Sequence, residues 1–373
     1  MRVCHMTSAH GVEDIRIFHK ECVSLSQGGY EVFLVERGES YEKSGVHIVG
    51  VGDIPTSRLK RMLFGARRVY QKALEIDAEI YHLHDPELLP YGLKLKKQGK
   101  KVVFDSHEHT RTQILNKGYL PRWCTNLVSR VYGVYEDYVL RHIDGVIFPC
   151  PLNGSFPYVC RHTAYVNNVP KMNELYDEYD AEAVKDSNTV CMIGSLTYDR
   201  GVKHFVLAAY KAGCKALLGG NVTPVSFMEE LRGLPESSTA EFLGYLNREQ
   251  VKTVLKQSSI GSAVLLNVGQ YSRTENLATK VYEYMSMGLP VLLTKNTYNE
   301  NMVNQYGFGR CVDPENIDEY AEAIRYILDH EDEAKQMGDR GRELVREKLN
   351  WSIEERNLFR LYEEVSAETH GTV

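Results

Sequence analysis

Residues 273–291 read RTENLATKVYEYMSMGLPV. Within this stretch the spacing of apolar residues changes from that of a helix to that of a strand, and this change decides the fold. The spacing of apolar residues predicts a helix from Thr279 to Gly288, and Pro290 then opens a short buried strand. A helix that runs directly into an apolar strand is one step of an alternating strand–helix chain. The stretch therefore predicts an α/β domain.

Short apolar runs alternate with helical patterns along most of the chain. The expected strands are Arg2–Met6, Glu31–Glu36, Val46–Val51, Ile80–Leu83, Lys101–Asp105, Gly145–Phe148, Thr189–Ile193, Ala216–Leu218, Glu241–Leu243, Ile260–Leu266 and Pro290–Thr294. Such alternation implies parallel sheets with helices on both faces. We expect two Rossmann-like, doubly wound units.

The alternation breaks at residues 167–170, which read NNVP, and no strand is expected in the acidic, tyrosine-rich segment 171–187 that follows. We therefore expect an N-terminal domain over 1–168 and a C-terminal domain over 169–351. The last helix, within 352–373, is expected to pack back on the first domain. Ligands of such sheets bind at the carboxyl ends of the strands, so a cleft between the two domains is the expected site.

The composition is that of an ordinary globular protein, with 43% hydrophobic and 25% charged residues in 373. The sequence contains no apolar run long enough to span a membrane, and its N-terminus lacks the apolar stretch of a signal peptide. The 8 cysteines are scattered and form no C-x-x-C pair, which argues against a disulfide framework and a zinc ribbon. We expect a cytoplasmic protein.

The formal net charge of −6 is divided unevenly between the two halves. Residues 1–165 carry a net charge of +4 and the remainder a net charge of −10. This asymmetry suggests that the two domains face different partners. The acidic second half argues against nucleic acid as a ligand.

The predicted helix from Thr279 carries a possible binding site at its N-terminus. Free backbone amides there favour phosphate, Lys280 adds a full positive charge, and Glu283 can accept hydrogen bonds from sugar hydroxyls. Glu275 lies eight residues before Glu283. The alternative is an ordinary first turn with a surface Lys–Glu pair.

Residues 275–291 resemble the donor-binding motif of retaining glycosyltransferases with the GT-B fold, specifically family four. The matching positions are Glu275, Thr279-Lys280, Glu283-Tyr284-Met285 and Gly288-x-Pro290-Val291. The resemblance extends over nearly the whole chain. It implies that Glu283 binds the ribose hydroxyls of a nucleotide-sugar donor and that Glu275 contacts the donor sugar. One departure is Asn276-Leu277, where the family has Phe-Gly.

Residues 192–202, after the first strand of the second half, agree with the same family in part. Gly194 allows backbone amides to approach a ligand, and Arg200 supplies a guanidinium for pyrophosphate. Ser195 stands where the family has a first cation, so Lys280 would share the phosphate charge. The plain alternative is a strand-to-helix turn with an exposed arginine.

Residues 104–109 read FDSHEH and resemble the D-x-H-E sequence of the family. There the histidine faces the donor sugar, so His107 is the candidate catalytic residue, together with Glu275, Arg200 and Lys280. The alternative is a strand end whose polar side chains cap the next element.

A second enzyme class is suggested by the histidine-rich run at residues 81–89, YHLHDPELL. His82, His84, Asp85 and His107 form a possible ligand set for a metal-dependent hydrolase. The HDPE run also occurs in bacterial relatives of the glycosyltransferase family, near the acceptor side. The glycosyltransferase interpretation requires no metal, because Arg200, Lys280 and the helix N-terminus would stabilise the leaving pyrophosphate.

Two further segments concern the acceptor. Asp14 and Arg16 resemble the family's D-x-R-I-F sequence, in which they would bind an acceptor hydroxyl and an acceptor phosphate; capping of the helix is the alternative. Residues 57–72 contain six basic residues, no acid and an apolar stripe. Such a helix can lie on an anionic membrane surface or bury its apolar side in the core.

Together these features predict a retaining glycosyltransferase that moves a sugar from a nucleotide-sugar donor, expected to be a UDP-sugar. The acceptor would be a saccharide or a lipid-linked saccharide at the inner face of the membrane, as in surface polysaccharide synthesis. A non-catalytic nucleotide-sugar-binding protein is the third interpretation.

Overall fold

The computed structural model describes residues 1–55, 57–116, 122–152, 154–180, 188–267 and 275–367. The chain divides into two compact units. The first unit comprises Met1–Asn168 and Trp351–Val373, and the second comprises Val169–Asn350.

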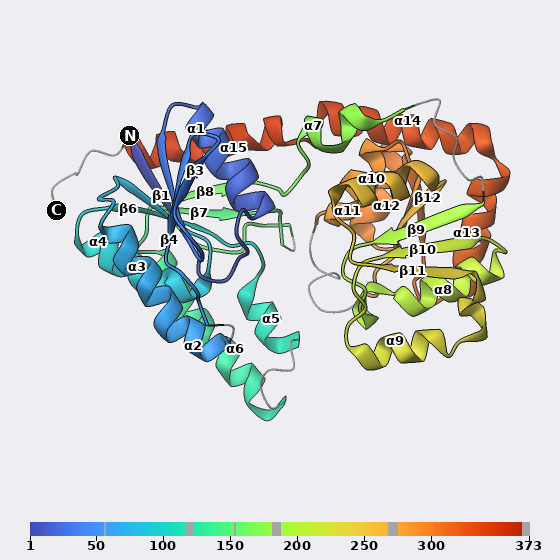
Figure 1. Cartoon of the computed structure of the whole chain (residues 1–373), viewed down its shortest axis with the longest axis horizontal. Coiled ribbons are helices and arrows are strands. Elements are labelled where there is room, and N and C mark those ends of the chain that lie inside the picture. The colour runs from blue at the N-terminus through green and yellow to red at the C-terminus, as the bar shows by residue number, and fades with distance from the viewer. Residues whose placement is uncertain (56, 117–121, 153, 181–187, 268–274, 368–373) are drawn as a thin grey trace. The chain divides into compact units, whose positions relative to one another are not determined.

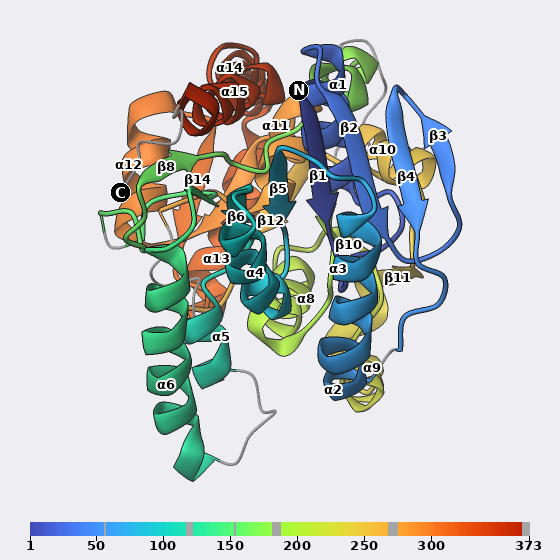
Figure 2. The ribbon, with the colours of Figure 1, turned by 90° about the vertical axis from the view of Figure 1, so that its left-hand side faces the viewer.

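The first unit contains an eight-stranded sheet in the order β3-β4-β2-β1-β5-β6-β7-β8 (Figures 1 and 2). Its strands are β1 Arg2–Met6, β2 Glu31–Glu36, β3 Tyr41–Lys43, β4 Val46–Gly50, β5 Ile80–Leu83, β6 Lys101–Asp105, β7 Gly145–Phe148 and β8 His162–Tyr165. All neighbours are parallel except the short, exposed edge strand β3, which runs antiparallel to β4.

Helices cover both faces of this sheet. They are η1 Ile15–Cys22, α1 Val23–Gln27, α2 Arg58–Lys60, η2 Arg61–Gly65, α3 Ala66–Leu74, η3 Pro86–Leu88, α4 Leu89–Lys97, α5 Thr110–Asn116, α6 Arg122–Leu140 and α15 Trp351–Ala367. One core contains residues of α3, α4 and α6, and the other contains residues of η1, α1 and α15. The buried Trp351 side chain donates to Ser24 Oγ at 2.7 Å, which ties the start of α15 to α1.

The second unit contains an entirely parallel sheet in the order β11-β10-β9-β12-β13-β14. Its strands are β9 Thr189–Ile193, β10 Lys215–Gly219, β11 Ala240–Gly244, β12 Ile260–Ala263, β13 Val291–Thr294 and β14 Gly309–Val312. Its helices are α7 Met172–Leu175, η4 Tyr176–Glu178, η5 Tyr198–Arg200, α8 Val202–Lys211, α9 Val225–Arg232, η6 Pro235–Thr239, α10 Arg248–Gln257, α11 Thr279–Ser286, α12 Thr297–Tyr306, α13 Ile317–Asp329 and α14 Glu331–Glu347. One core contains residues of α8, α9 and α13, and the other contains residues of α10, α11 and α14.

Each expected strand has a counterpart within a few residues, and the expected helix from Thr279 ends at Ser286. The spacing did not reveal β3, β8 and β14, because strands of three or four residues that are partly exposed have no clear alternation. Gly288 has a φ of +65°, and a Cβ there would lie 2.7 Å from the Tyr179 ring, so glycine is required between α11 and β13.

Candidate functional site

The first part of the site is the turn that follows β9 in the second unit. Gly194 has a φ of +136°, and its N–H donates to the Gly219 carbonyl at 2.8 Å. A Cβ at Gly220 would lie only 1.8 Å from the Gly194 carbonyl oxygen, so the ends of β9 and β10 approach backbone to backbone. Ser195 follows Gly194 as an exposed residue. The turn thus presents main chain rather than side chains at the carboxyl edge of the sheet.

The same turn leads into α8 through η5, which contains Arg200. Gly201 caps α8 with a φ of +67°, and a Cβ there would lie 2.5 Å from the Val264 carbonyl oxygen. The chain can therefore turn into the helix close to the end of β12 only with glycine at this position. Arg200 is half-buried immediately before this turn.

The start of α11 carries a cluster of charges around Glu283. Lys280 Nζ donates to Glu283 Oε2 at 2.8 Å, and Arg248 Nη1 donates to Glu283 Oε1 at 3.0 Å. Arg248 also donates to Glu174 Oε2 at 3.1 Å. Glu283 is 9% exposed, whereas Thr279 at the start of the helix is exposed. A buried carboxylate is thus held between two cations at a helix N-terminus.

The cations decide the protonation state of this carboxylate. Burial alone would raise the pKa of Glu283, but the charges and hydrogen bonds of Lys280 and Arg248 outweigh burial and hold the pKa below its ordinary value. Glu283 is therefore an acceptor at neutral pH. Each carboxylate oxygen has a second lone pair, so the group retains capacity for a ligand hydroxyl.

Packing connects this charge cluster with the glycine turn. A Cβ at Gly194 would lie 3.7 Å from Lys280 Cε, so the lysine stem passes beside the turn. The buried Tyr284 hydroxyl accepts a hydrogen bond from the Ile193 N–H at 2.9 Å, which ties α11 to the end of β9. The structure thus brings Gly194, Lys280 and Glu283 together at one edge of the sheet.

The departure at Asn276-Leu277 has a structural explanation. Asn276 accepts a hydrogen bond from the Tyr282 hydroxyl, and Leu277 is 2% exposed in the core beneath α11. These residues anchor the segment that precedes the helix. Glu275 is partly exposed next to this anchor.

In the first unit, Asp14 and Arg16 have clear structural partners. Asp14 Oδ1 caps η1 by accepting from the N–H groups of Arg16 at 2.8 Å and Ile17 at 3.1 Å. Arg16 is 4% exposed and forms two hydrogen bonds with Asp105, Nε to Oδ2 at 2.7 Å and Nη2 to Oδ1 at 2.9 Å. Its Nη1 donates to the Val166 carbonyl. The guanidinium that we expected to hold an acceptor phosphate is thus bound inside the unit.

His107 lies at the end of the same network. Its Nε2 lies 3.0 Å from Asp105 Oδ2 and 3.2 Å from His84 Nδ1. Its side chain is 19% exposed, whereas Asp105 and His84 are buried. Burial would raise the pKa of Asp105, but Arg16 and the histidines hold that pKa well below its ordinary value, so Asp105 is a carboxylate that orients His107.

The expected hydrolase ligand set is only partly assembled, because His84 and His107 lie together with Asp105, whereas Asp85 is bound elsewhere. Asp85 accepts hydrogen bonds from Thr7 Oγ1 at 2.9 Å and from the N–H groups of Ser8 and Ala9, and its Oδ1 lies 3.2 Å from His10 Nδ1. Its two oxygens are therefore used by the turn after β1. His82 and His84 group instead with His5 and Glu21.

Part of the chain matches a known family model. Residues 177–344 match the family of group 1 glycosyl transferases. The matched segment contains the Gly194 turn, Arg200 and the Lys280–Glu283 pair of the second unit. No curated protein matches the chain in sequence.

Solved structures resemble the whole chain. Sucrose-phosphate synthase from Thermosynechococcus elongatus has a TM-score of 0.80 at 16% identity, over 99% of both chains. A glycosyltransferase from Rickettsia africae has a TM-score of 0.73 at 13% identity, also over 99% of both. Anabaena HepE, solved with UDP, has a TM-score of 0.69 at 13% identity over 97% of this chain and 99% of HepE. The fold is GT-B.

In the first unit, the basic segment 57–72 is divided between surface and core. Ala66, Val69 and Tyr70 belong to the core, whereas Leu59, Leu63 and Phe64 are 60–73% exposed. Of its charges, Arg61 pairs with Glu87 at 2.8 Å and Arg68 donates to the carbonyls of Val51 and Asp53. Lys60 and Arg67 are exposed. Among the described helices, none is long and apolar enough to cross a bilayer.

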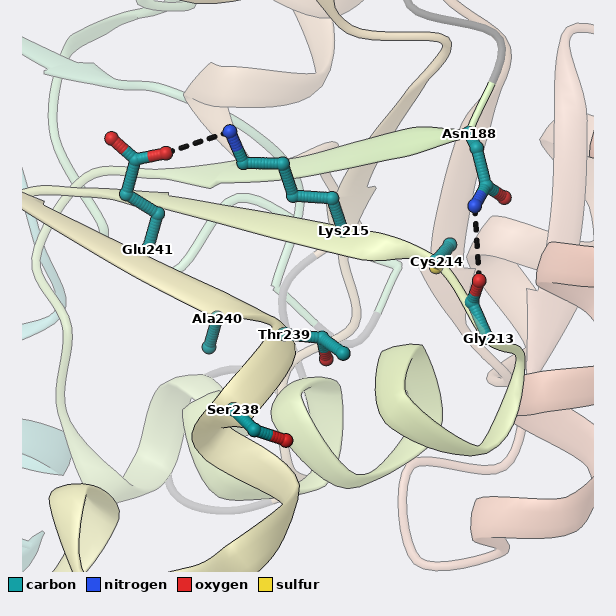
Figure 3. A pocket seen from close by; sticks show the side chains of 8 residues that line it. All are labelled: Asn188, Gly213, Cys214, Lys215, Ser238, Thr239, Ala240 and Glu241. Atoms are coloured by element: carbon teal, nitrogen blue, oxygen red, sulfur yellow. Dashed lines mark hydrogen bonds and ion pairs between the residues drawn. The ribbon is translucent and has the colours of Figure 1, made fainter.

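A separate hollow lies at the opposite edge of the second sheet, where β9, β10 and β11 begin. Its volume is about 480 Å³ and its lining is Asn188, Gly213, Cys214, Lys215, Ser238, Thr239, Ala240 and Glu241 (Figure 3). Lys215 pairs with Glu241 at 2.8 Å across it. This hollow lies at the amino ends of the strands, away from the Gly194 turn.

Sequence reasoning missed three residues of these clusters: Arg248, His5 and Glu21. Arg248 follows Asn247, which forms a capping box with Gln250, and the N-x-x-Q spacing is a signal that a helix begins there. His5 occupies a strand position on the same face as His82, which the alternation of β1 and β5 could have revealed.

Proposed function

We propose that this protein is a retaining, metal-independent hexosyltransferase that uses a UDP-sugar donor. The observation that carries the proposal is the Lys280–Glu283–Arg248 cluster beside the Gly194 turn. It combines free helix amides and a cation for phosphate with a buried carboxylate acceptor for a diol. Support for the uridine base comes from HepE, which has been solved with UDP and with UDP-glucose.

In the proposed complex, Glu283 accepts hydrogen bonds from the ribose hydroxyls. Gly194 lets the chain approach the pyrophosphate, Ser195 presents its backbone amide, Thr279 lies at the first turn of α11, and Arg200 and Lys280 neutralise the pyrophosphate. Glu275 and His107 contact the donor sugar. These roles follow from the residue chemistry and from the family resemblance, and Arg16 has no place among them because it is bound to Asp105.

The proposed reaction breaks the bond between the anomeric carbon and the phosphate oxygen and forms a bond from that carbon to an acceptor hydroxyl oxygen. The hydroxyl proton passes to the leaving phosphate, on the same face of the sugar, so the anomeric configuration is retained. Arg200 and Lys280 stabilise the negative charge that develops on the leaving group. Arg200→Ala should therefore lower kcat more than it raises KM.

We further propose that the acceptor is a saccharide, free or lipid-linked, reached at an anionic membrane surface. The exposed Leu59, Leu63 and Phe64 beside Lys60 and Arg67 support this part of the proposal. A cytoplasmic enzyme would reach lipid-linked acceptors in this way.

A donor panel tests the proposal. UDP-glucose, UDP-galactose, UDP-N-acetylglucosamine, GDP-mannose and ADP-glucose are compared by thermal shift, and transfer of the preferred sugar to saccharide acceptors is followed by NMR of the anomeric proton. We expect a UDP-sugar to give the largest shift, an unchanged anomeric configuration, and the same rate with or without EDTA. UDP binding without transfer would indicate a binding protein, and inversion would overturn the retaining mechanism.

A further inference from the structure

The first unit contains a second cluster of chemically capable side chains, which the proposed transfer reaction does not use. His5 on β1 stands in register with His82 on β5, and His84 follows two residues later on the same face. All three imidazoles are buried. Their ring centroids are 4.5–5.1 Å apart, so the rings form a compact stack against the core that η1 and α15 cover.

Glu21 of η1 faces this stack with a buried carboxylate. One oxygen, Oε1, lies 3.1 Å from Arg16 Nε. The other, Oε2, lies 3.9 Å from His82 Nδ1 and 3.9 Å from His84 Nε2. Neither oxygen accepts a hydrogen bond from a residue that the structure describes, and the same is true of His82 Nε2. Buried polar atoms without partners are rare in proteins and require an explanation.

The spacing of these atoms fits one metal ion. His5, Glu21, His82 and His84 each offer one ligand atom, and the four atoms lie within 4.8 Å of one another. The closest pair, His5 Nδ1 and His84 Nε2, is 2.9 Å apart. A tetrahedral zinc site with metal–nitrogen distances of about 2.05 Å has edges of roughly 3.3 Å, so the observed separations lie on both sides of the required value.

The surroundings also resemble those of metal ligands. His84 presents its other nitrogen, Nδ1, to Asp105 Oδ2 at 3.6 Å and to His107. The Tyr362 hydroxyl lies 3.3 Å from His5 Nε2, the nitrogen of that ring other than the one that faces His84. Outer partners of this kind, a carboxylate above all, orient the imidazoles that bind metal ions.

We propose that His5, Glu21, His82 and His84 bind one zinc ion in a closed structural site. Three imidazoles and one carboxylate fill all four positions of a tetrahedral ion, which leaves none for substrate. The ion would hold β1, β5 and η1 together, and its ligand His84 would connect it to His107. This role does not depend on the proposed sugar transfer, and a site without an open position is compatible with transfer that needs no added metal.

Metal content provides the test. The full chain is unfolded in guanidinium with a chelator and refolded with one equivalent of zinc, because a closed site must be loaded during folding. Bound zinc is then counted by elemental analysis and its affinity measured by chelator competition. We expect about one zinc per chain for the wild type and, for Glu21→Gln, at least about a tenfold weaker affinity.

A matched control is Glu136→Gln. Glu136 is also fully buried in the first unit, but it pairs with Arg111 at 2.7 Å outside the cluster. This variant should retain zinc, and far-ultraviolet circular dichroism of all three proteins verifies folding. Cobalt-refolded wild type provides a second readout, since a tetrahedral His₃-carboxylate site gives intense visible absorption.

Two results would overturn the proposal. One is a folded wild type that retains no zinc and shows no tetrahedral cobalt spectrum. The other is zinc that binds equally well to Glu21→Gln. Either result would mean that these four side chains do not bind a zinc ion together.

Discussion

The polar groups at the carboxyl ends of the two sheets are arranged in opposite ways. In the first unit Arg16, Asp105 and His84 are buried and bound to one another. In the second unit Ser195, after the Gly194 turn, is exposed, and the Lys280 side chain is 30% exposed. Two mainly parallel sheets thus carry different polar groups at the carboxyl ends of their strands. The first buries its charge pairs, and the second keeps the cations of its Lys280–Glu283–Arg248 cluster about one third exposed.

The largest effect that would break this comparison concerns Arg16. Arg16→Met should destabilise the protein by roughly 3–5 kcal/mol, because it leaves Asp105 and Glu21 without their buried cation. The exposed pair of Arg2 with Glu31 offers a control, and Arg2→Met should destabilise the protein far less, because solvent screens that pair. Chemical denaturation measures both. If both variants lost the same free energy of unfolding, the buried Arg16 network would stabilise the protein no more than an exposed ion pair does.

The second prediction concerns the ligand side of the comparison. Glu283→Gln should weaken UDP binding by about 1.5–3 kcal/mol, or one to two decades, because charge-assisted hydrogen bonds to the ribose are lost. Glu174→Gln is the matched control, since it removes the other carboxylate of Arg248 and leaves Glu283 in place. Calorimetric titration with UDP measures both variants. Unchanged binding by Glu283→Gln would remove Glu283 from the donor site.

The third prediction concerns how the free energy of unfolding depends on pH through buried carboxylates of the two units. Glu36, at the end of β2, is 1% exposed, and burial raises its pKa to about 7. Between the ordinary value of 4.5 and about 7, the folded protein holds a proton that the unfolded chain has lost. The free energy of unfolding should therefore fall as the pH rises through this window, by on the order of 1–2 kcal/mol after solvent screening.

Glu36→Gln should remove that fall, as seen by denaturation at pH 5 and pH 8. Glu283 provides the opposite case, because its lowered pKa gives stability that is present above its ordinary value of 4.5 and is lost as the pH falls through the folded value. Glu283→Gln should remove only the loss of unfolding free energy at acid pH. If the free energy of unfolding depended on pH in the same way in both variants, the opposite pKa shifts of Glu36 and Glu283 would be contradicted.

The smallest expected effect concerns the surface segment before α3. Changing Leu59, Leu63 and Phe64 to Ser should reduce co-sedimentation with anionic vesicles several-fold and leave the free energy of unfolding nearly unchanged, because these side chains are exposed. Replacing Val69 by Ser is the contrasting change, since that side chain is in the core and should destabilise the unit. Absence of vesicle binding by the wild type would remove the membrane part of the proposal.

The sequence by itself was sufficient for the strand–helix architecture and for the helix from Thr279. Strand–helix alternation is a local pattern of apolar residues, so most strands and the helix from Thr279 could be located without knowing what they pack against. Spacing also placed Lys280 and Glu283 on adjacent turns, where the structure finds them bonded.

Only the tertiary structure decided which distant side chains share a partner. Arg248 reaches Glu283 from another helix, Arg16 is bound to Asp105, and His82 groups with Glu21 rather than with Asp85. These pairings join residues 35 to 89 positions apart. They depend on strand order and on which face each helix covers, and a local period carries no information on either.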